Sequence, residues 1–191
     1  PWKGEEDYRW AVLQNDIPSL KNKLSWSLFN LFFICFYQMG LIFLFSLPIL
    51  SSWQGEIGLS NTDFVIAFIM LLLIIIQTIA DEQQHIYQSK KYKLIKANQE
   101  LPVKYKKGFI DKGLWKYSRH PNYTCEQLIW ITFYFFSVSA NGKLINWSII
   151  GCLLLVILFY FSAKFSEGIS SKKYPQYKNY QKQTPMFIGY K

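Results

Sequence analysis

Uncharged apolar blocks dominate the sequence and alternate with shorter polar segments. The four blocks that we interpret as membrane spans lie at residues 25–50, 63–80, 126–142 and 144–163. A helix needs roughly 20 mostly apolar residues to cross a hydrocarbon core about 30 Å thick. The second and third blocks reach that length only with the help of Asp63, Asp81 and Glu126 at their ends. The pattern predicts an all-α fold, a polytopic membrane helical bundle of about four transmembrane helices plus interfacial helices, in a single domain over residues 1–191. A soluble protein with four buried core helices is the alternative.

The basic residues lie almost entirely between and beyond these blocks. All of the 21 lysines and arginines except Lys143 fall in residues 1–24, 81–125 and 164–191. Such residues favour the cytoplasmic side of a membrane. We therefore expect both termini, the basic loop 81–125 and the tail 164–191 on one side, which faces the cytosol or the mitochondrial matrix. The protein is predicted to be an integral membrane protein of the mitochondrial inner membrane or the endoplasmic reticulum.

Composition narrows the possible partners. The chain is 51% apolar and 19% aromatic, with a formal net charge of +9. Lysines beside membrane helices commonly reach anionic headgroups, so membrane lipids are the expected partners. No nucleic acid is expected, because the cations flank spans and follow no nucleic-acid-binding motif. The three cysteines lack the spacing of a zinc site or a disulfide framework, and no metal is expected.

A basic and aromatic stretch precedes the third block and contains the strongest candidates for ligand binding. Arg119 offers a planar fork that suits phosphate. His120 and Tyr123 offer hydrogen bonds or a ring to stack on, and Asn122 can both donate to and accept from a carboxamide. Glu126 lies one turn into the predicted span, where a carboxyl group is costly unless it is paired or functional. It could stay protonated and donate to a carbonyl oxygen, or it could pair with Arg119 or a lysine.

Two other segments could complete a site with this stretch. Asp81 ends the second block and is followed closely by Gln83. It is either the N-cap of a separate polar helix or a ligand for a ribose or amide. The tail carries Glu167 and three tyrosines at a spacing of three, which predicts one helix face. That face could close over a nucleotide or lie in the membrane interface. These tyrosines are Tyr174, Tyr177 and Tyr180. No glycine pattern of a dinucleotide fold or a P-loop occurs.

Together these motifs resemble the membrane-embedded steroid 5-alpha-reductase-like family, in particular its DUF1295-type branch. The matching elements are Ala80-Asp81-Glu82-Gln83, the stretch from Gly113 to Glu126, Glu167 with Tyr177 and Tyr180, Phe187-Ile188, and the opening from Trp2 to Arg9. Isoprenylcysteine and phospholipid methyltransferases share the Arg-His-Pro-x-Tyr core. Asn122 together with Glu126 favours the reductase branch.

The resemblance implies an NADPH site on the basic side and reduction of an activated C=C bond. Glu126 would be catalytic, polarising the carbonyl while hydride passes to the β-carbon. The cofactor-binding residues implied are Asp81, Gln83, Arg119, His120, Asn122, Tyr123, Glu167 and Tyr177.

Three departures from the family pattern keep other functions open. Cys125 stands where the family has glycine, Gly168 stands where a basic residue is usual, and the chain begins partway through the family's helices. We therefore consider three hypotheses. The first is an NADPH-dependent reductase that acts on a steroid or other lipid. The second is a non-catalytic subunit that has lost the cofactor and joins other membrane subunits, for example in a mitochondrial respiratory assembly. The third is an S-adenosylmethionine-dependent membrane methyltransferase.

Overall fold

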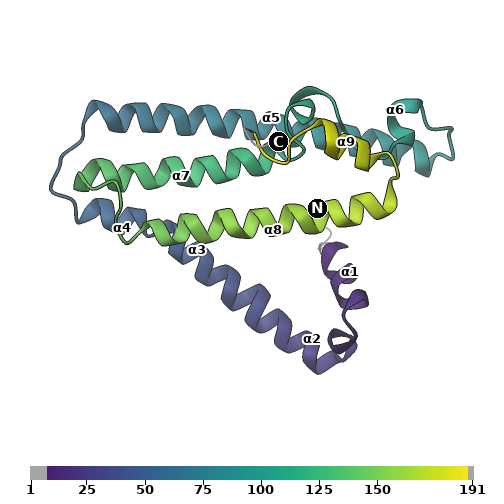
Figure 1. The fold of residues 1–191 in the computed structure, drawn as a ribbon, viewed down its shortest axis with the longest axis horizontal. Helices are drawn as coiled ribbons and strands as arrows, with labels where there is room; N and C mark the ends of the chain where they lie inside the picture. The colour runs from purple at the N-terminus through teal and green to yellow at the C-terminus, as the bar shows by residue number, and fades with distance from the viewer. Residues whose placement is uncertain (1–7, 189–191) are drawn as a thin grey trace. The chain divides into compact units, whose positions relative to one another are not determined.

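The computed structural model describes residues 8–188, and all regular structure within them is helical (Figure 1). The helices and helical turns in chain order are α1 (Tyr8–Asp16), η1 (Pro18–Lys21), α2 (Lys23–Phe29), η2 (Asn30–Tyr37), α3 (Gln38–Ser46), α4 (Pro48–Trp53), α5 (Asn61–Lys96), α6 (Val103–Lys106), η3 (Gly113–Lys116), α7 (Pro121–Asn141), α8 (Ile149–Lys173) and α9 (Tyr177–Gln183). The predicted all-α class is confirmed. The chain forms two compact units, Pro1–Leu44 and Phe45–Lys191, and the candidate site lies wholly in the second. The expected single domain over residues 1–191 stays a prediction.

Within the described residues, three helical stretches are long and apolar enough to cross a membrane. They are Lys23–Trp53, Asn61–Lys96 and Ile149–Lys173. Many of their large apolar side chains are more than half exposed, among them Phe64, Phe68 and Leu71 of α5. Such surfaces suit contact with lipid tails, which solvate apolar side chains as well as a protein core does.

The span expected at residues 126–142 coincides with α7, which is not one of these three stretches. Its first two turns carry Asn122, Thr124, Glu126 and Gln127, which lower its apolar character. In Figure 1, α7 runs beside α5 and α8, and its buried face includes Cys125 and Ile129. The side chain of Cys125, which replaces the family glycine, is accommodated with 2% exposure. A fourth span therefore stays a prediction.

Helix α5 is the longest element and determines where the site forms. Its 36 residues rise about 54 Å, well beyond a hydrocarbon core. Ser60 and Asp63 form the capping box at its start, with the Asp63 carboxylate 2.8 Å from the Ser60 backbone nitrogen. The expected N-cap at Asp81 is therefore wrong, because α5 continues through this position without a break. Its extension past Asp81 carries Gln83, Tyr87 and Lys90 to the cationic end of the second unit.

Candidate functional site

Arg119 and Glu167 form a buried ion pair. Arg119 lies just before α7 and Glu167 lies on α8, and their side chains join through two hydrogen bonds. Nε of Arg119 donates to Oε1 of Glu167 over 2.6 Å, and Nη2 donates to Oε2 over 3.0 Å. The two residues are 9% and 4% exposed. This two-pronged geometry is the strongest that a guanidinium and a carboxylate can form.

The remaining bonds of this pair attach the C-terminal segment to the start of α7. Nη1 of Arg119 donates to the carbonyls of Gln181 at 3.0 Å and Thr184 at 2.5 Å. The Gln181 amide donates to Glu167 over 2.8 Å, and Nε2 of His120 lies 3.0 Å from the same carboxylate. We call these five residues the arginine cluster. A guanidinium has five N–H donors, and four of those of Arg119 are bound within the protein. The expected phosphate-binding role of Arg119 and the expected cofactor-binding roles of His120 and Glu167 stay predictions.

The tail tyrosines gather around one aromatic ring. Tyr174 is the C-cap of α8, whereas Tyr177 and Tyr180 lie three residues apart on α9, so the predicted single helix face is wrong for Tyr174 alone. Pro175 accounts for this, since the residue before a proline is disfavoured in helical geometry. Nevertheless, the ring centroids of Tyr174, Tyr177 and Tyr180 lie 6.2, 5.0 and 5.3 Å from that of Phe109. The tail therefore packs against the loop that precedes α7.

Two buried hydrogen bonds, made by Tyr180 and Trp115, stabilise this packing. The Tyr180 hydroxyl donates to the carbonyl of Trp115, whose indole donates to the Ala80 carbonyl over 3.1 Å. Burial raises the pKa of the Tyr180 phenol above its ordinary value, so this side chain is neutral and donates. Tyr123 stacks on the His120 ring at 5.2 Å and meets Phe159 edge-on at 4.9 Å.

Two polar bridges join α5 to α7, one helical turn apart. Nδ2 of Asn122 donates to Oδ1 of Asp81 over 2.9 Å at an exposed position. Nε2 of Gln77 donates to Oε2 of Glu126 over 2.6 Å, and the Trp130 indole donates to Oε1 over 2.9 Å. We call Gln77, Asp81, Asn122 and Glu126 the polar seam. Of the two alternatives for Glu126, pairing with Arg119 or a lysine is wrong, because the Gln77 amide and the Trp130 indole donate to it instead. Sequence reasoning missed Gln77, although its position one turn before Asp81 was a usable signal.

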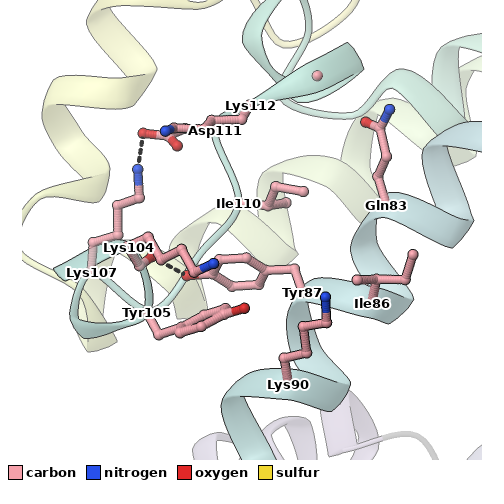
Figure 2. Close-up of a pocket in the computed structure, with 11 residues that line it drawn as sticks. Gln83, Ile86, Tyr87, Lys90, Lys104, Tyr105, Lys107, Ile110, Asp111 and Lys112 are labelled. Carbon is pink, nitrogen blue, oxygen red and sulfur yellow. Dashed lines mark hydrogen bonds and ion pairs between the residues drawn. The ribbon is translucent and has the colours of Figure 1, made fainter. Parts of the chain in front are cut away.

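Gln83 lies apart from the seam and takes part in a pocket. Its Oε1 accepts from the backbone nitrogen of Leu114 over 3.0 Å. Figure 2 shows this pocket between the extension of α5 and the loop that carries α6, with a volume of about 380 Å³. Its main lining residues are Gln83, Tyr87, Lys90, Lys104, Tyr105 and Lys112. We call it the lysine pocket. Most of the lysines, without distinction among them, were expected to meet lipid headgroups.

These observations define a helical protein with membrane-length apolar helices and a polar seam at their cationic end. Residues 1–184 match the family described as a protein of unknown function, DUF1295, and the chain belongs to that family. An uncharacterized protein of Schizosaccharomyces pombe is 31% identical over 196 residues, which cover 97% of this chain and 55% of that protein. The chain thus spans about half the length of this relative. No solved structure matches the chain.

Proposed function

We propose that this protein is an NADPH-dependent membrane reductase that acts on the activated C=C bond of a steroid or other lipid. The observation that carries the proposal is the fixed carboxyl group of Glu126 on the polar seam, one turn from the Asp81–Asn122 pair. Glu126 is the residue to which the family resemblance assigns carbonyl polarisation. Gln77 and Trp130 each donate to a different oxygen, so they fix the orientation of the carboxyl group.

Two features of the described residues fit NADPH. The Asp81–Asn122 pair is accessible and offers both an acceptor and a donor, as recognition of a carboxamide requires. Gln83 leads along α5 from this pair to the lysine pocket, whose cations suit phosphates. When bound, the cofactor would supply the hydride. In this proposal the arginine cluster and Tyr177 act by holding the loop and tail around the site.

The proposed role of Glu126 is to donate a hydrogen bond to the substrate carbonyl. Each carboxyl oxygen accepts one N–H and retains a second lone pair, so a proton on one of them remains compatible with both bonds. Polarising the carbonyl makes the β-carbon electrophilic. The bound cofactor would supply the hydride to the β-carbon and solvent water would supply the proton to the α-carbon, which would leave the saturated ketone, NADP⁺ and hydroxide.

The test uses the purified full chain in lipid nanodiscs with NADPH and an enone-bearing steroid. We expect NADPH to be consumed in a one-to-one ratio with saturated product. Glu126→Gln should lower kcat by about 10²-fold or more while NADPH binding is retained. Glu82→Gln, at an exposed position beside Asp81, is the matched control and should be unaffected. Equal rates for wild type and Glu126→Gln, or no NADPH binding by folded protein, would overturn the proposal. Methyl transfer from labelled S-adenosylmethionine would replace it with the methyltransferase hypothesis.

One observation favours the non-catalytic subunit as the second candidate. The arginine cluster uses the most prominent charges of the motif to hold the chain together. A subunit that retains the fold without the cofactor would keep these bonds. This hypothesis predicts stoichiometric migration with a larger membrane assembly on native gels, and assembly unchanged by Glu126→Gln. Migration of the chain only by itself would contradict it.

A further inference from the structure

The lysine pocket is held open by a loop that three hydrogen bonds tie to α5. The Tyr87 hydroxyl donates to the Lys104 carbonyl over 2.9 Å, and Nζ of Lys91 donates to the Gly108 carbonyl over 3.0 Å. The third bond joins Leu114 to Gln83. Lys91 is 4% exposed, so this anchor is part of the packed structure. The loop from Lys104 to Leu114 is therefore bonded to α5 near its start and at its end, and the pocket lies between this loop and α5.

The charge around this hollow is unbalanced. Four lysines and a single carboxylate, Asp111, line it. Asp111 pairs with Lys107, which leaves Lys90, Lys104 and Lys112. Across residues 8–188, no carboxylate lies within ion-pair distance of these three lysines. Three ammonium groups around one hollow repel one another, and an anion would relieve that repulsion.

The wall between the lysines is aromatic and apolar. The Tyr87 and Tyr105 rings lie 5.2 Å apart at 52°, and Ile86 and Ile110 complete the lining. Nζ of Lys104 lies 4.8 Å from the centroid of the Tyr105 ring. Water or a small inorganic anion needs no such wall. An organic group attached to a phosphate would bury apolar surface against it.

The pocket also lies at a depth where phosphate is abundant. Asp81 ends the uncharged part of α5, and Tyr87 follows after about 9 Å of helical rise. The headgroup layer extends roughly 5–8 Å beyond the hydrocarbon core. The pocket thus reaches from the headgroup layer into the aqueous phase.

We propose that the lysine pocket binds a phosphate ester, with Lys90, Lys104 and Lys112 around the phosphate and the tyrosine wall against its organic group. The phosphate comes either from an anionic phospholipid or from a soluble nucleotide. This inference rests on the proposed function in one respect, because the same pocket is the one that suits the NADPH phosphates, but neither source of phosphate requires Glu126.

The experiment compares two variants of the full chain with equal loss of charge. The pocket variant is Lys90→Gln/Lys104→Gln/Lys112→Gln. The control is Lys172→Gln/Lys178→Gln/Lys182→Gln, whose lysines are exposed near the C-terminal end and line no part of this pocket. Lys90→Arg/Lys104→Arg/Lys112→Arg keeps the charge and tests rescue. Helical content and thermal unfolding are measured for each variant, so that a misfolded protein is recognised.

In the first arm, pyrophosphate is titrated into the protein and binding is measured by calorimetry. In the second arm, the protein is mixed with vesicles of phosphatidate and phosphatidylcholine, and native mass spectrometry measures the phosphatidate that it retains. We expect the pocket variant to lose affinity at least about tenfold in one arm, and the control less than about twofold. Loss in the first arm identifies a soluble phosphate, and loss in the second a lipid headgroup. Equal affinity of both variants in both arms would overturn the site. Glu126→Gln should bind pyrophosphate as wild type does. The phosphate site and the reductase activity can therefore fail independently of one another.

Discussion

The arginine cluster and the lysine pocket are both charged and both lie at the cationic end of the second unit, yet they use their charge differently. In the cluster, Arg119 and Glu167 are nearly buried and bind one another or backbone carbonyls. In the pocket, Lys90, Lys104 and Lys112 have no carboxylate partner among the described residues. A buried charge must be paired because an unpaired one costs several kcal/mol, whereas solvated lysines carry no such penalty. The charged residues of the recognisable motif therefore bind one another and stabilise the fold. The lysines that could bind an anion lie outside that motif.

The largest effect is expected from breaking the cluster. Glu167→Leu leaves the Arg119 guanidinium buried without a partner, and should cost about 3–5 kcal/mol of unfolding free energy. Denaturant unfolding of the purified protein in detergent measures it. Glu100→Leu is the matched control, since its pair with Lys106 is exposed and should contribute little.

The double variant Arg119→Met/Glu167→Leu distinguishes pairing from packing. Removing both charges should recover most of the lost stability, as replacement of a buried pair by apolar groups often does. A single Glu167→Leu variant as stable as wild type would mean that the cluster does not hold the tail.

A smaller effect is expected at Tyr180, which joins the tail to the loop near the cluster. Tyr180→Phe leaves the buried Trp115 carbonyl without its donor and should cost about 1–3 kcal/mol. Tyr117→Phe is the control, because the Tyr117 side chain is 67% exposed. Equal melting temperatures for the two variants would argue against the bond.

The same residue makes stability depend on alkaline pH. Burial raises the folded-state pKa of Tyr180 above the unfolded value of about 10. The folded protein therefore retains this proton more tightly than the unfolded chain does. The contribution of Tyr180 to the free energy of unfolding is complete below about pH 10 and is lost as the pH rises further. Tyr180→Phe should remove that part of the alkaline destabilisation, measured as the pH midpoint of unfolding.

A still smaller effect on stability, combined with a change in binding, is expected at the rim of the lysine pocket. Gly113 has φ of +65°, and an added Cβ would meet the Gln83 carboxamide. Gly113→Ala should cost about 1–2 kcal/mol and weaken pyrophosphate binding, because Gln83 must leave Leu114. Gly142→Ala is the control, because Gly142 has φ of +67° and an added Cβ there would have its nearest contact at Ile57. It should lower the free energy of unfolding by a similar amount without changing the pocket. Identical binding by both variants would contradict this geometry.

The smallest effect is expected beside the cluster, at Gly168. A Cβ added there meets no described atom within 4 Å, and the residue lies inside α8. Gly168→Ala should therefore stabilise the protein by about 0.5–1 kcal/mol through helix propensity. A loss of stability in thermal unfolding would show that the surface next to Glu167 is covered.

The sequence predicted the helical class and the membrane-length apolar helices because hydrophobic block length is a property of adjacent residues. It failed at Asp81, because a carboxylate after an apolar run looks the same at a helix start and inside a longer helix. It also could not identify the partner of Arg119, since Glu167 lies 48 residues away and a guanidinium suits phosphate and carboxylate equally.

The polar seam was predicted in part. Asp81, Arg119, Asn122 and Glu126 were expected around one cavity. The structure bonds Asn122 to Asp81 and Gln77 to Glu126 between α5 and α7, whereas Arg119 bonds to Glu167. The lysine pocket was not predicted, because nothing in the local pattern indicates which of many loop lysines line the same hollow as Tyr87. That convergence depends on the path of the loop, which the Tyr87 and Lys91 bonds fix.

An experimental density map of the full chain in nanodiscs with bound NADPH tests the contrast between cluster and pocket most directly. The account predicts phosphate density beside Lys90, Lys104 and Lys112, with the two Arg119–Glu167 hydrogen bonds intact. Phosphate density on the Arg119 guanidinium, with Glu167 displaced and the lysine pocket empty, would contradict it.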